Sequence, residues 1–182
     1  STIDFAAPFG VGIEADPDDP TRYAVWVAQG GIGMPDRDYY LRKDEKFEAT
    51  RAAYVRYLTT MLTLAKQPDP AGAATRILAL ETRIAEQHWD RARNRDRDAT
   101  YNKMSVAELG TLTPSFSWPP YFRAAGLDKA THVVVRQPDY LKALDGLLRD
   151  ATAQVLAHGG RVLQYAGDSL LATFGGEAGP SA

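Results

Sequence analysis

The 182-residue sequence contains no cysteine, which excludes disulfide bonds, thiolate nucleophiles and thiolate metal sites. It also lacks an excess of charge of either sign, since 21 Lys and Arg stand against 23 Asp and Glu. The net charge of −2 gives no electrostatic reason to expect a nucleic acid partner or an anionic membrane surface. No apolar run approaches the ~20 residues of a membrane span, so no span is expected in this sequence.

Residues for hydrolytic chemistry are also sparse. The three histidines are His88, His132 and His158, and none has a second His four residues away. The helix-borne His-Glu-x-x-His zinc pair is therefore absent, and so is a Gly-x-Ser-x-Gly nucleophile motif. We predict no catalytic residue and no cofactor-binding residue in this sequence. His88, beside Trp89, is interpreted as a packing residue.

Hydrophobic periodicity predicts a mainly α fold: a helical domain with an N-terminal β-hairpin and a C-terminal β-hairpin. Two apolar, β-branched and aromatic runs, Phe9–Ile13 and Tyr23–Val27, flank the turn signal Asp16–Pro20 and predict the first hairpin. Arg161–Tyr165 and Leu170–Phe174 predict the second.

Two amphipathic helices are predicted between the hairpins, at Asp44–Lys66 and Ala73–Trp89. Asp44 is the expected N-cap of the first helix. The short Pro-Asp-Pro connection favours an antiparallel pair. We expect this pair to bury six apolar side chains: Phe47, Leu58, Leu62, Ile77, Leu80 and Ile84.

Shorter elements are predicted in the second half of the chain. Ser105 begins a capping box and a short helix, and Trp118–Ala125 predicts another with prolines in its first turn. His132–Val135 is a short apolar strand. The helical pattern from Pro138 to Ala157 runs without a break until the Gly159-Gly160 stop.

The glycine-rich segment Gln29–Pro35 predicts a tight structural turn. Its glycine spacing does not fit a phosphate-binding loop, and no Lys-Ser/Thr follows. Asp36 and Asp38 come next, flanked by Arg37 and Arg42, which indicates ion pairing rather than acid/base chemistry.

Two further clusters have structural interpretations. The arginines at 91, 93, 95 and 97 alternate with aspartates at 90, 96 and 98, a pattern typical of a self-compensating loop. An aromatic set without a basic groove indicates core or interhelical packing rather than base stacking; it comprises Trp26, Tyr39, Tyr40, Tyr54 and Tyr57.

Asp168 is the one candidate metal ligand. It follows Gly167 at the tip of the C-terminal hairpin, where a short carboxylate side chain is well placed for a divalent cation. An Asp at such a position is more often only a turn residue.

Several motifs up to Asp150 occur in an order that resembles the neprilysin and endothelin-converting-enzyme family of zinc metallopeptidases, particularly its bacterial members. They are the hairpin, the run Gln29–Leu41 with its Arg-Asp-Tyr-Tyr, Glu81 on a helix, and Tyr101–Met104. Val133–Val135 and Gln137–Leu141 also fit.

In that family the zinc site consists of a His-Glu-x-x-His helix and a downstream Glu. The resemblance places both outside this sequence, so it assigns no zinc-binding or catalytic role to any residue here. It implies the substrate-enclosing part of a peptidase, peptide substrates and zinc for the intact protein, and a periplasmic or extracellular location if the parent is exported.

The tail from about Ala151 resembles class III adenylate and guanylate cyclases, in the pattern His158-Gly-Gly-Arg-Val followed by Gly167-Asp168 and Leu171–Gly175. There the resemblance implies that Asp168 binds a catalytic Mg²⁺. The other metal Asp, in a Phe-x-Asp-Ile-x-Gly-Phe motif, is absent.

We therefore predict a metallopeptidase-like helical region over residues 1–150 and a cyclase-like helix end and hairpin over residues 151–182. No linker marks the junction, which favours a chimeric or rearranged origin. The favoured function is an incomplete neprilysin-like zinc metallopeptidase, inactive alone. The alternatives are a partial cyclase-related chain and a non-catalytic peptide-binding helical module. The open edges of the C-terminal hairpin also predict some self-association.

Overall fold

A four-stranded mixed sheet lies at the centre of the computed structural model, which describes residues 8–158, 160–166 and 169–174, with side chains up to residue 158. The strands are β1 (Phe9–Asp16), β2 (Asp19–Gln29), β3 (Asn102–Ser105) and β4 (His132–Val135). Their order in the sheet is β1-β2-β4-β3, with β2 and β4 parallel and the other two pairs antiparallel. The sheet therefore joins segments that lie more than one hundred residues apart in the sequence.

The sheet corrects the predicted fold class. The N-terminal hairpin is confirmed, and about half of the described residues are helical. The architecture is nevertheless α/β rather than mainly α, because β3 and β4 extend the hairpin into a sheet. Val25 pairs with Val133, a long-range contact that no local pattern in the sequence can show.

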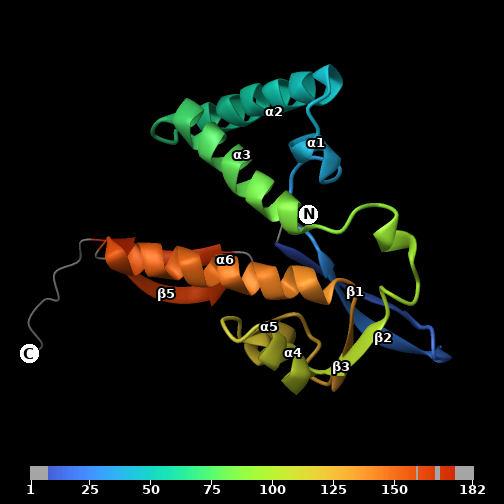
Figure 1. Cartoon of the computed structure of the whole chain (residues 1–182). Helices are drawn as coiled ribbons and strands as arrows, with labels where there is room; N and C mark the ends of the chain where they lie inside the picture. Colours follow the sequence, from blue (N-terminus) through green and yellow to red (C-terminus); the bar gives the residue numbers. More distant parts are fainter. Residues whose placement is uncertain (1–7, 159, 167–168, 175–182) are drawn as a thin grey trace, which may run out of the picture.

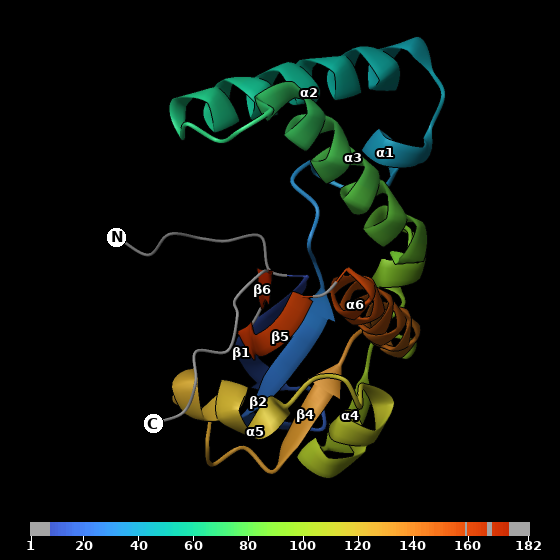
Figure 2. The same ribbon diagram turned by 90° about the vertical axis from the view of Figure 1, so that its left-hand side faces the viewer.

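Three helices pack against the sheet: α4 (Val106–Leu112), α5 (Trp118–Ala124) and α6 (Pro138–Ala157), as Figure 2 shows. The predicted capping box of α4 is present, since the Ser105 side chain accepts from the Glu108 N–H and the Glu108 side chain accepts from the Ser105 N–H. The main core lies between these helices and the sheet. Its most deeply buried side chains are Val27, Leu109, Trp118, Val133, Val135, Tyr140 and Leu141.

A second, helical lobe stands away from the sheet (Figure 1). It consists of α1 (Asp38–Leu41), α2 (Glu45–Leu64) and α3 (Pro70–Gln87). As predicted, α2 and α3 pack together as an antiparallel pair. Asp44 is the N-cap residue of α2, as predicted, but its carboxylate accepts from Arg42 Nε at 2.8 Å and makes no capping hydrogen bond to the helix.

The predicted core of the helix pair is only partly correct. Ile84 is buried and belongs to the main core, whereas Phe47, Leu58, Leu62 and Ile77 are half-buried. The prediction is wrong for Leu80, which is 52% exposed. No residue of α2 is buried, so this helix contributes less to a core than the apolar pattern of its sequence predicts.

The C-terminal hairpin consists of β5 (Gly160–Ala166) and β6 (Ser169–Phe174), which pair antiparallel as predicted. Within the described residues, β5 follows α6 closely and packs beside it. Asp168, the candidate metal ligand, lies outside the described residues, so its role stays a prediction. The same holds for self-association through this hairpin. No helix in the described ranges is long and apolar enough to span a membrane.

Candidate functional site

The richest polar cluster joins the helical lobe to the sheet lobe. The segment that follows β2 meets the segment that follows α3 around a pocket of about 450 Å³. We call this region the lobe junction. Its walls contain Gln29, Gly30, Met34, Asp36, Arg37, His88, Trp89, Arg91 and Asn94.

Gln29 and Trp89 form the centre of the lobe junction. The Gln29 side chain donates to the Trp89 carbonyl at 3.1 Å and accepts from the Trp89 N–H at 2.8 Å. Gln137 extends this pair, because its Oε1 accepts from the Gln29 N–H at 2.8 Å and its Nε2 donates to Asn94 at 2.8 Å. These bonds connect β2, the end of α3 and the start of α6, so they position three elements at once.

His88 and Tyr140 both bind the carbonyl of Gly30. The His88 Nε2 lies 2.8 Å from that oxygen, and the Tyr140 hydroxyl donates to it at 2.9 Å. Burial lowers the pKa of His88 below its ordinary value, which keeps the ring neutral near pH 7. The neutral ring packs edge-on against Tyr140, with ring centroids 4.8 Å apart. The predicted packing role of His88 fits this geometry.

The glycine-rich segment has the predicted structural role, although it is an irregular segment that bends from Gly33 to Asp36 rather than a hydrogen-bonded turn. Gly31 has φ +83, and a Cβ there would lie 2.7 Å from the Pro8 Cα. A Cβ on Gly33 would lie 2.1 Å from the Tyr54 hydroxyl. Position 31 therefore requires glycine for its backbone conformation, and position 33 requires glycine for the close approach of the Tyr54 side chain.

Glu81 of α3 binds two tyrosines inside the helical lobe. The hydroxyl of Tyr40 donates to one carboxylate oxygen at 2.6 Å and that of Tyr54 donates to the other at 3.0 Å. The Tyr40 hydroxyl also accepts from the Met34 N–H at 2.9 Å. Burial, together with the neighbouring carboxylate, raises the pKa of both tyrosines, so they remain protonated donors. The Arg-Asp-Tyr-Tyr motif thus locks α1 to α2 and α3.

The ion pairs around Asp36 differ from the predicted ones. Asp36 pairs with Arg91, across the lobe junction, rather than with Arg37 or Arg42. Arg37 donates to the His88 carbonyl at 2.8 Å. Ion pairing as such is confirmed, but its partners are distant in sequence.

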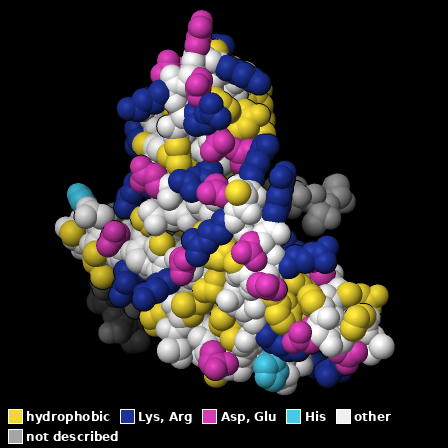
Figure 3. Space-filling view, turned by 45° about the vertical axis from the view of Figure 1, so that its right-hand side comes forward, with side chains coloured by type: hydrophobic (Ala, Val, Ile, Leu, Met, Phe, Trp, Pro, Cys, Tyr) yellow, Lys and Arg dark blue, Asp and Glu magenta, His cyan; other side chains and the backbone are white. Residues whose placement is uncertain are grey.

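The prediction that the arginine-rich loop compensates its own charges is also wrong. Arg93 pairs with Asp139 at 2.8 Å and also lies over the Trp89 ring, 3.5 Å from its centroid. Arg91 pairs with Asp36. Both arginines hold the loop against other elements, which the local alternation of charges does not reveal. Across the face in Figure 3, cationic and anionic side chains are mixed, with no extended field of one sign.

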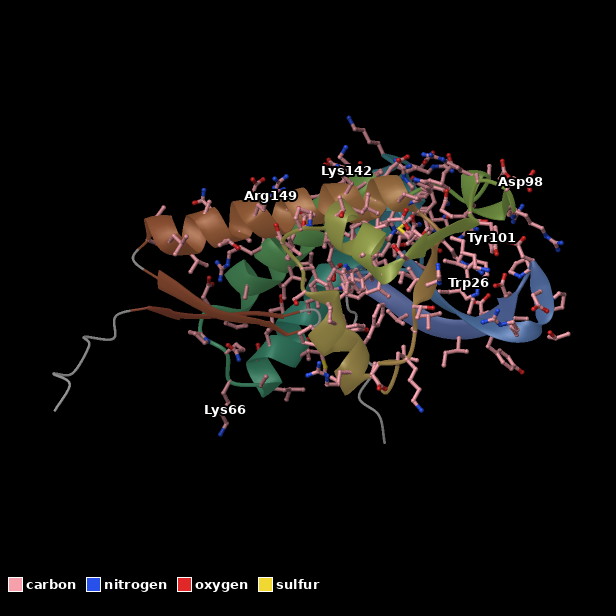
Figure 4. All side chains as sticks on the ribbon, turned by 90° about the horizontal axis from the view of Figure 1, so that it is seen from below. Trp26, Lys66, Asp98, Tyr101, Lys142 and Arg149 are labelled. Atoms are coloured by element: carbon pink, nitrogen blue, oxygen red, sulfur yellow. The ribbon has the colours of Figure 1, made fainter. Side chains whose placement is uncertain are left out.

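A second polar cluster closes the turn between β1 and β2. The hydroxyl of Tyr101 lies 2.6 Å from Asp16 Oδ1 and 2.8 Å from Asp18 Oδ2, and Lys103 Nζ pairs with Asp16 Oδ2 at 2.6 Å. Tyr101 also packs beside Trp26, with ring centroids 6.0 Å apart (Figure 4). The Tyr-Asn-Lys-Met motif therefore fixes the tip of the hairpin rather than forming a reaction centre.

The Asp16 carboxylate predicts a specific pH dependence of stability. The hydrogen bonds from Lys103 and Tyr101 lower the pKa of Asp16 from 3.8 to about 2. Its contribution to stability is therefore present above pH 3.8 and is lost as the pH falls towards 2. We expect Asp16→Asn to be less stable than the wild type at pH 7, and the difference to close between pH 4 and pH 2, as measured by urea unfolding. A difference that stays constant over this range would contradict the assignment.

The described residues do not fit a zinc site. Each histidine ring has a separate partner: His88 meets the Gly30 carbonyl, His132 meets Thr131 and His158 meets the Gln154 carbonyl. Among the residues with described side chains, no group of three or more His, Asp or Glu could hold a metal ion. A catalytic zinc needs about three protein ligands, so no reaction step is assigned to a metal in this part of the chain.

Comparison with known proteins decides the family. The family model described as Peptidase family M13 matches residues 2–159. This chain belongs to peptidase family M13. Endothelin-converting enzyme 1 of Cavia porcellus is 31% identical over 147 residues, which are 77% of this chain and 19% of that protein. The chain thus spans about a fifth of the length of the curated relatives it matches.

Solved structures show the same relationship for the M13 chain. The crystal structure of the zinc metalloprotease ZMP1 of Mycobacterium tuberculosis, in complex with an inhibitor, matches with a TM-score of 0.74 and 38% identity. The match covers 82% of this chain and 23% of ZMP1. PepO of Lactobacillus rhamnosis shares the fold with a TM-score of 0.59 at 19% identity, over 79% of this chain and 23% of PepO.

These comparisons confirm the metallopeptidase resemblance and give no support to the cyclase resemblance or to a chimeric origin. The family match extends to residue 159, and α6 runs unbroken from Pro138 to Ala157. Whether the chain divides into two parts near residue 150 stays a prediction.

Sequence reasoning misses most of the lobe junction and the pair of tyrosines on Glu81. It identifies Gln29, Glu81 and Gln137 only as members of family motifs. The signal in the sequence is the type of residue. These are long polar side chains beside glycines, prolines and apolar runs, and a polar group that is buried in such surroundings needs a hydrogen-bond partner. Their partners cannot be identified from the sequence, because the paired residues are 27 to 108 positions apart.

Proposed function

We propose that this chain is a non-catalytic, substrate-enclosing part of a zinc metallopeptidase of family M13, and that it does not hydrolyse peptides by itself. In this proposal zinc and the residues that hold it belong to another part of the peptidase. The single observation that carries the proposal is a family match over residues 2–159 without a zinc-fitting group among the described side chains.

The geometry of the family motifs supports a structural role. Each motif that carries the family resemblance joins elements to one another: Tyr40 and Tyr54 bind Glu81, Gln29 binds Trp89, and Tyr101 closes the hairpin. Their carboxylates and hydroxyls are occupied by one another. The chain therefore builds a rigid frame from which a substrate chamber can be assembled.

ZMP1 is a zinc metalloprotease, and the proposal extends that activity to the protein in which this chain acts. Zinc there would polarise the scissile carbonyl and lower the pKa of a bound water. A periplasmic or extracellular location, and peptides as substrates, belong to the same proposal.

We expect the purified chain to leave peptides intact. The test is a mixture of peptides incubated with the chain and ZnCl₂ and followed by mass spectrometry, with the mycobacterial metalloprotease as positive control. No cleavage is expected above the rate without protein, because no three-ligand site is available to zinc. Cleavage that a chelator abolishes and added zinc restores would overturn the proposal.

A further inference from the structure

The position of the helical lobe depends mainly on the lobe junction. The lobe has a small core of its own, formed by Met34, Tyr40 and Ala85. The chain passes between the two lobes after β2 and again after α3 (Figure 1). Among the described residues that are buried in the main core, Ile84 is the one that α1–α3 contribute. A change at the lobe junction can therefore move one lobe without dismantling the core of the other.

The ring of His88 lies between the lobes. His88 follows α3 directly and is only 5% exposed. Its contacts come from the other side of the lobe junction, since Nε2 meets the carbonyl of Gly30 after β2 and the ring packs edge-on against Tyr140 of α6. One imidazole thus touches the helical lobe, the sheet and α6.

The hydrogen bond to Gly30 fixes the tautomer of His88. A carbonyl oxygen only accepts, so the hydrogen of the neutral ring is on Nε2, which lies 2.8 Å from the Gly30 oxygen. Nδ1 is then the nitrogen that takes up a proton in acid, and the ring becomes a cation. A buried charge is unfavourable unless an opposite charge lies beside it.

The surroundings of His88 do not provide that opposite charge. Arg37 acts directly on the ring and disfavours its charged form. Asp36 pairs with Arg91, and no ion pair between described side chains includes His88. On α3, Glu81 is bound by two tyrosines. The charged and titratable groups on the neighbouring elements are Asp36, Arg37 and Asp38 after β2, Arg91 and Arg95 after α3, and Tyr140 on α6.

We infer that His88 is an acid-sensitive contact between the two lobes, and that protonation of its ring releases the helical lobe from the sheet lobe while the sheet lobe stays folded. The ring lines the pocket of about 450 Å³, so a charged ring can turn towards water there. The frame that this chain forms is then fixed near neutral pH and loosens in acid. This inference rests on contacts within the chain and does not depend on the proposed function.

The direction of the pH dependence follows from the two environments of the ring. In the released form the ring meets water and its pKa has the ordinary value of 6.5, whereas burial lowers the pKa in the closed form. Above pH 6.5 both forms are neutral and the lobes stay together. Below it the released form takes the proton first, so the ratio of released to closed molecules should rise by up to about tenfold per pH unit. The rise ends below the pKa of the buried ring.

The absence of cysteine allows the two lobes to be labelled specifically. Thr60→Cys on α2 and Thr111→Cys on α4 replace exposed residues, one in each lobe, and each can carry a spin label. Pulsed electron paramagnetic resonance then measures the distance between the labels at about pH 7.5 and about pH 5, on either side of the ordinary pKa of histidine. We expect one narrow distribution at the higher pH and an additional, broader one at the lower pH, which disappears when the pH is raised again.

Two substitutions test whether His88 is responsible. His88→Gln keeps an amide N–H that can donate to the Gly30 carbonyl but cannot take up a proton in this range, so its distribution should stay narrow at both pH values. His132→Gln is the matched control, because His132 is exposed on β4 and lies outside the lobe junction. It should respond to acid as the unsubstituted chain does. Both variants keep every carboxylate, so an effect of carboxylates would appear in both.

Amide hydrogen exchange on the unsubstituted chain provides a measurement that needs no variant. Relative to intrinsic rates, we expect acid to reduce protection in α1 and at the lobe junction, while β2 and β4 keep theirs. If the two lobes lose protection together, protonation unfolds the chain and the inference is wrong. A distance distribution that is the same at both pH values, or an acid response of His88→Gln equal to that of His132→Gln, would also overturn it.

Discussion

Trp118→Ala should remove about 3–5 kcal/mol from the free energy of unfolding, the range for truncating a buried tryptophan. Trp118 is 1% exposed and packs against Phe9, Phe116, Tyr121 and Phe122, with ring centroids 4.7–5.9 Å apart. Its removal leaves a cavity that the close-packed cluster can fill only if α5 shifts towards the sheet. The loss is large relative to the free energy of unfolding of a typical domain, which is roughly 5–15 kcal/mol.

The Trp118 side chain also makes a buried hydrogen bond, since its Nε1 donates to Thr113 Oγ1 at 2.7 Å. Trp118→Phe keeps most of the ring volume but leaves the Thr113 hydroxyl without this donor, so we expect a smaller loss of about 1–3 kcal/mol. Tyr23→Ala is the matched control, because Tyr23 is 80% exposed on the same sheet lobe and should change stability by less than about 0.5 kcal/mol. Equal losses for Trp118→Ala and Tyr23→Ala in urea titrations would contradict the described core.

Gly31→Ala should destabilise the chain by about 2–4 kcal/mol. Two costs add: a φ of +83 is unfavourable for alanine by about 1–2 kcal/mol, and the new Cβ would lie 2.7 Å from the Pro8 Cα. The obstructing atom belongs to the backbone, so no side-chain rotation can relieve the overlap. Moving the segment would also disturb the Gly30 carbonyl that His88 and Tyr140 share.

Substitutions at two other glycines distinguish the conformational cost from the cost of the steric overlap. Gly126 has φ +71, but a Cβ added there would meet nothing within 4 Å, so Gly126→Ala should show the conformational cost alone. Gly12, on β1, has open space and an ordinary φ, so Gly12→Ala should be close to neutral. Chemical denaturation should therefore rank the losses as Gly31 above Gly126 above Gly12. A Gly31→Ala variant as stable as Gly126→Ala would show that the close approach to Pro8 is absent.

The helices are predictable because their signals are local. The capping box at Ser105, the prolines that open α5 and α6, and the apolar repeat of α2 each act within a few residues. The first hairpin is predictable for the same reason, since its turn sequence separates two apolar runs.

The sheet and the burial within the helix pair are not predictable in the same way. Residues 132–135 are recognisable as a strand, but their pairing with β2 depends on contacts across the whole fold. The apolar pattern of α2 suggests one face, although its residues form two. A periodic pattern indicates that apolar residues recur, whereas burial depends on which other elements are near enough to cover them.

Little of the candidate site is predictable from the sequence. The absence of a histidine pair excludes the helix-borne zinc motif from the sequence alone. The lobe junction, by contrast, depends on Gln29, Trp89 and Gln137 meeting across three elements. Amide side chains are common in every sequence, and nothing in their local context marks these as buried partners.

The central claim is that this M13 chain forms a frame and does not carry the catalytic metal. Native mass spectrometry of the purified 182-residue chain, after incubation with excess zinc and buffer exchange, tests it most directly. We predict a single folded species at the mass of the metal-free chain. A species carrying one zinc ion per chain, lost on treatment with a chelator together with part of the folded signal, would contradict the account.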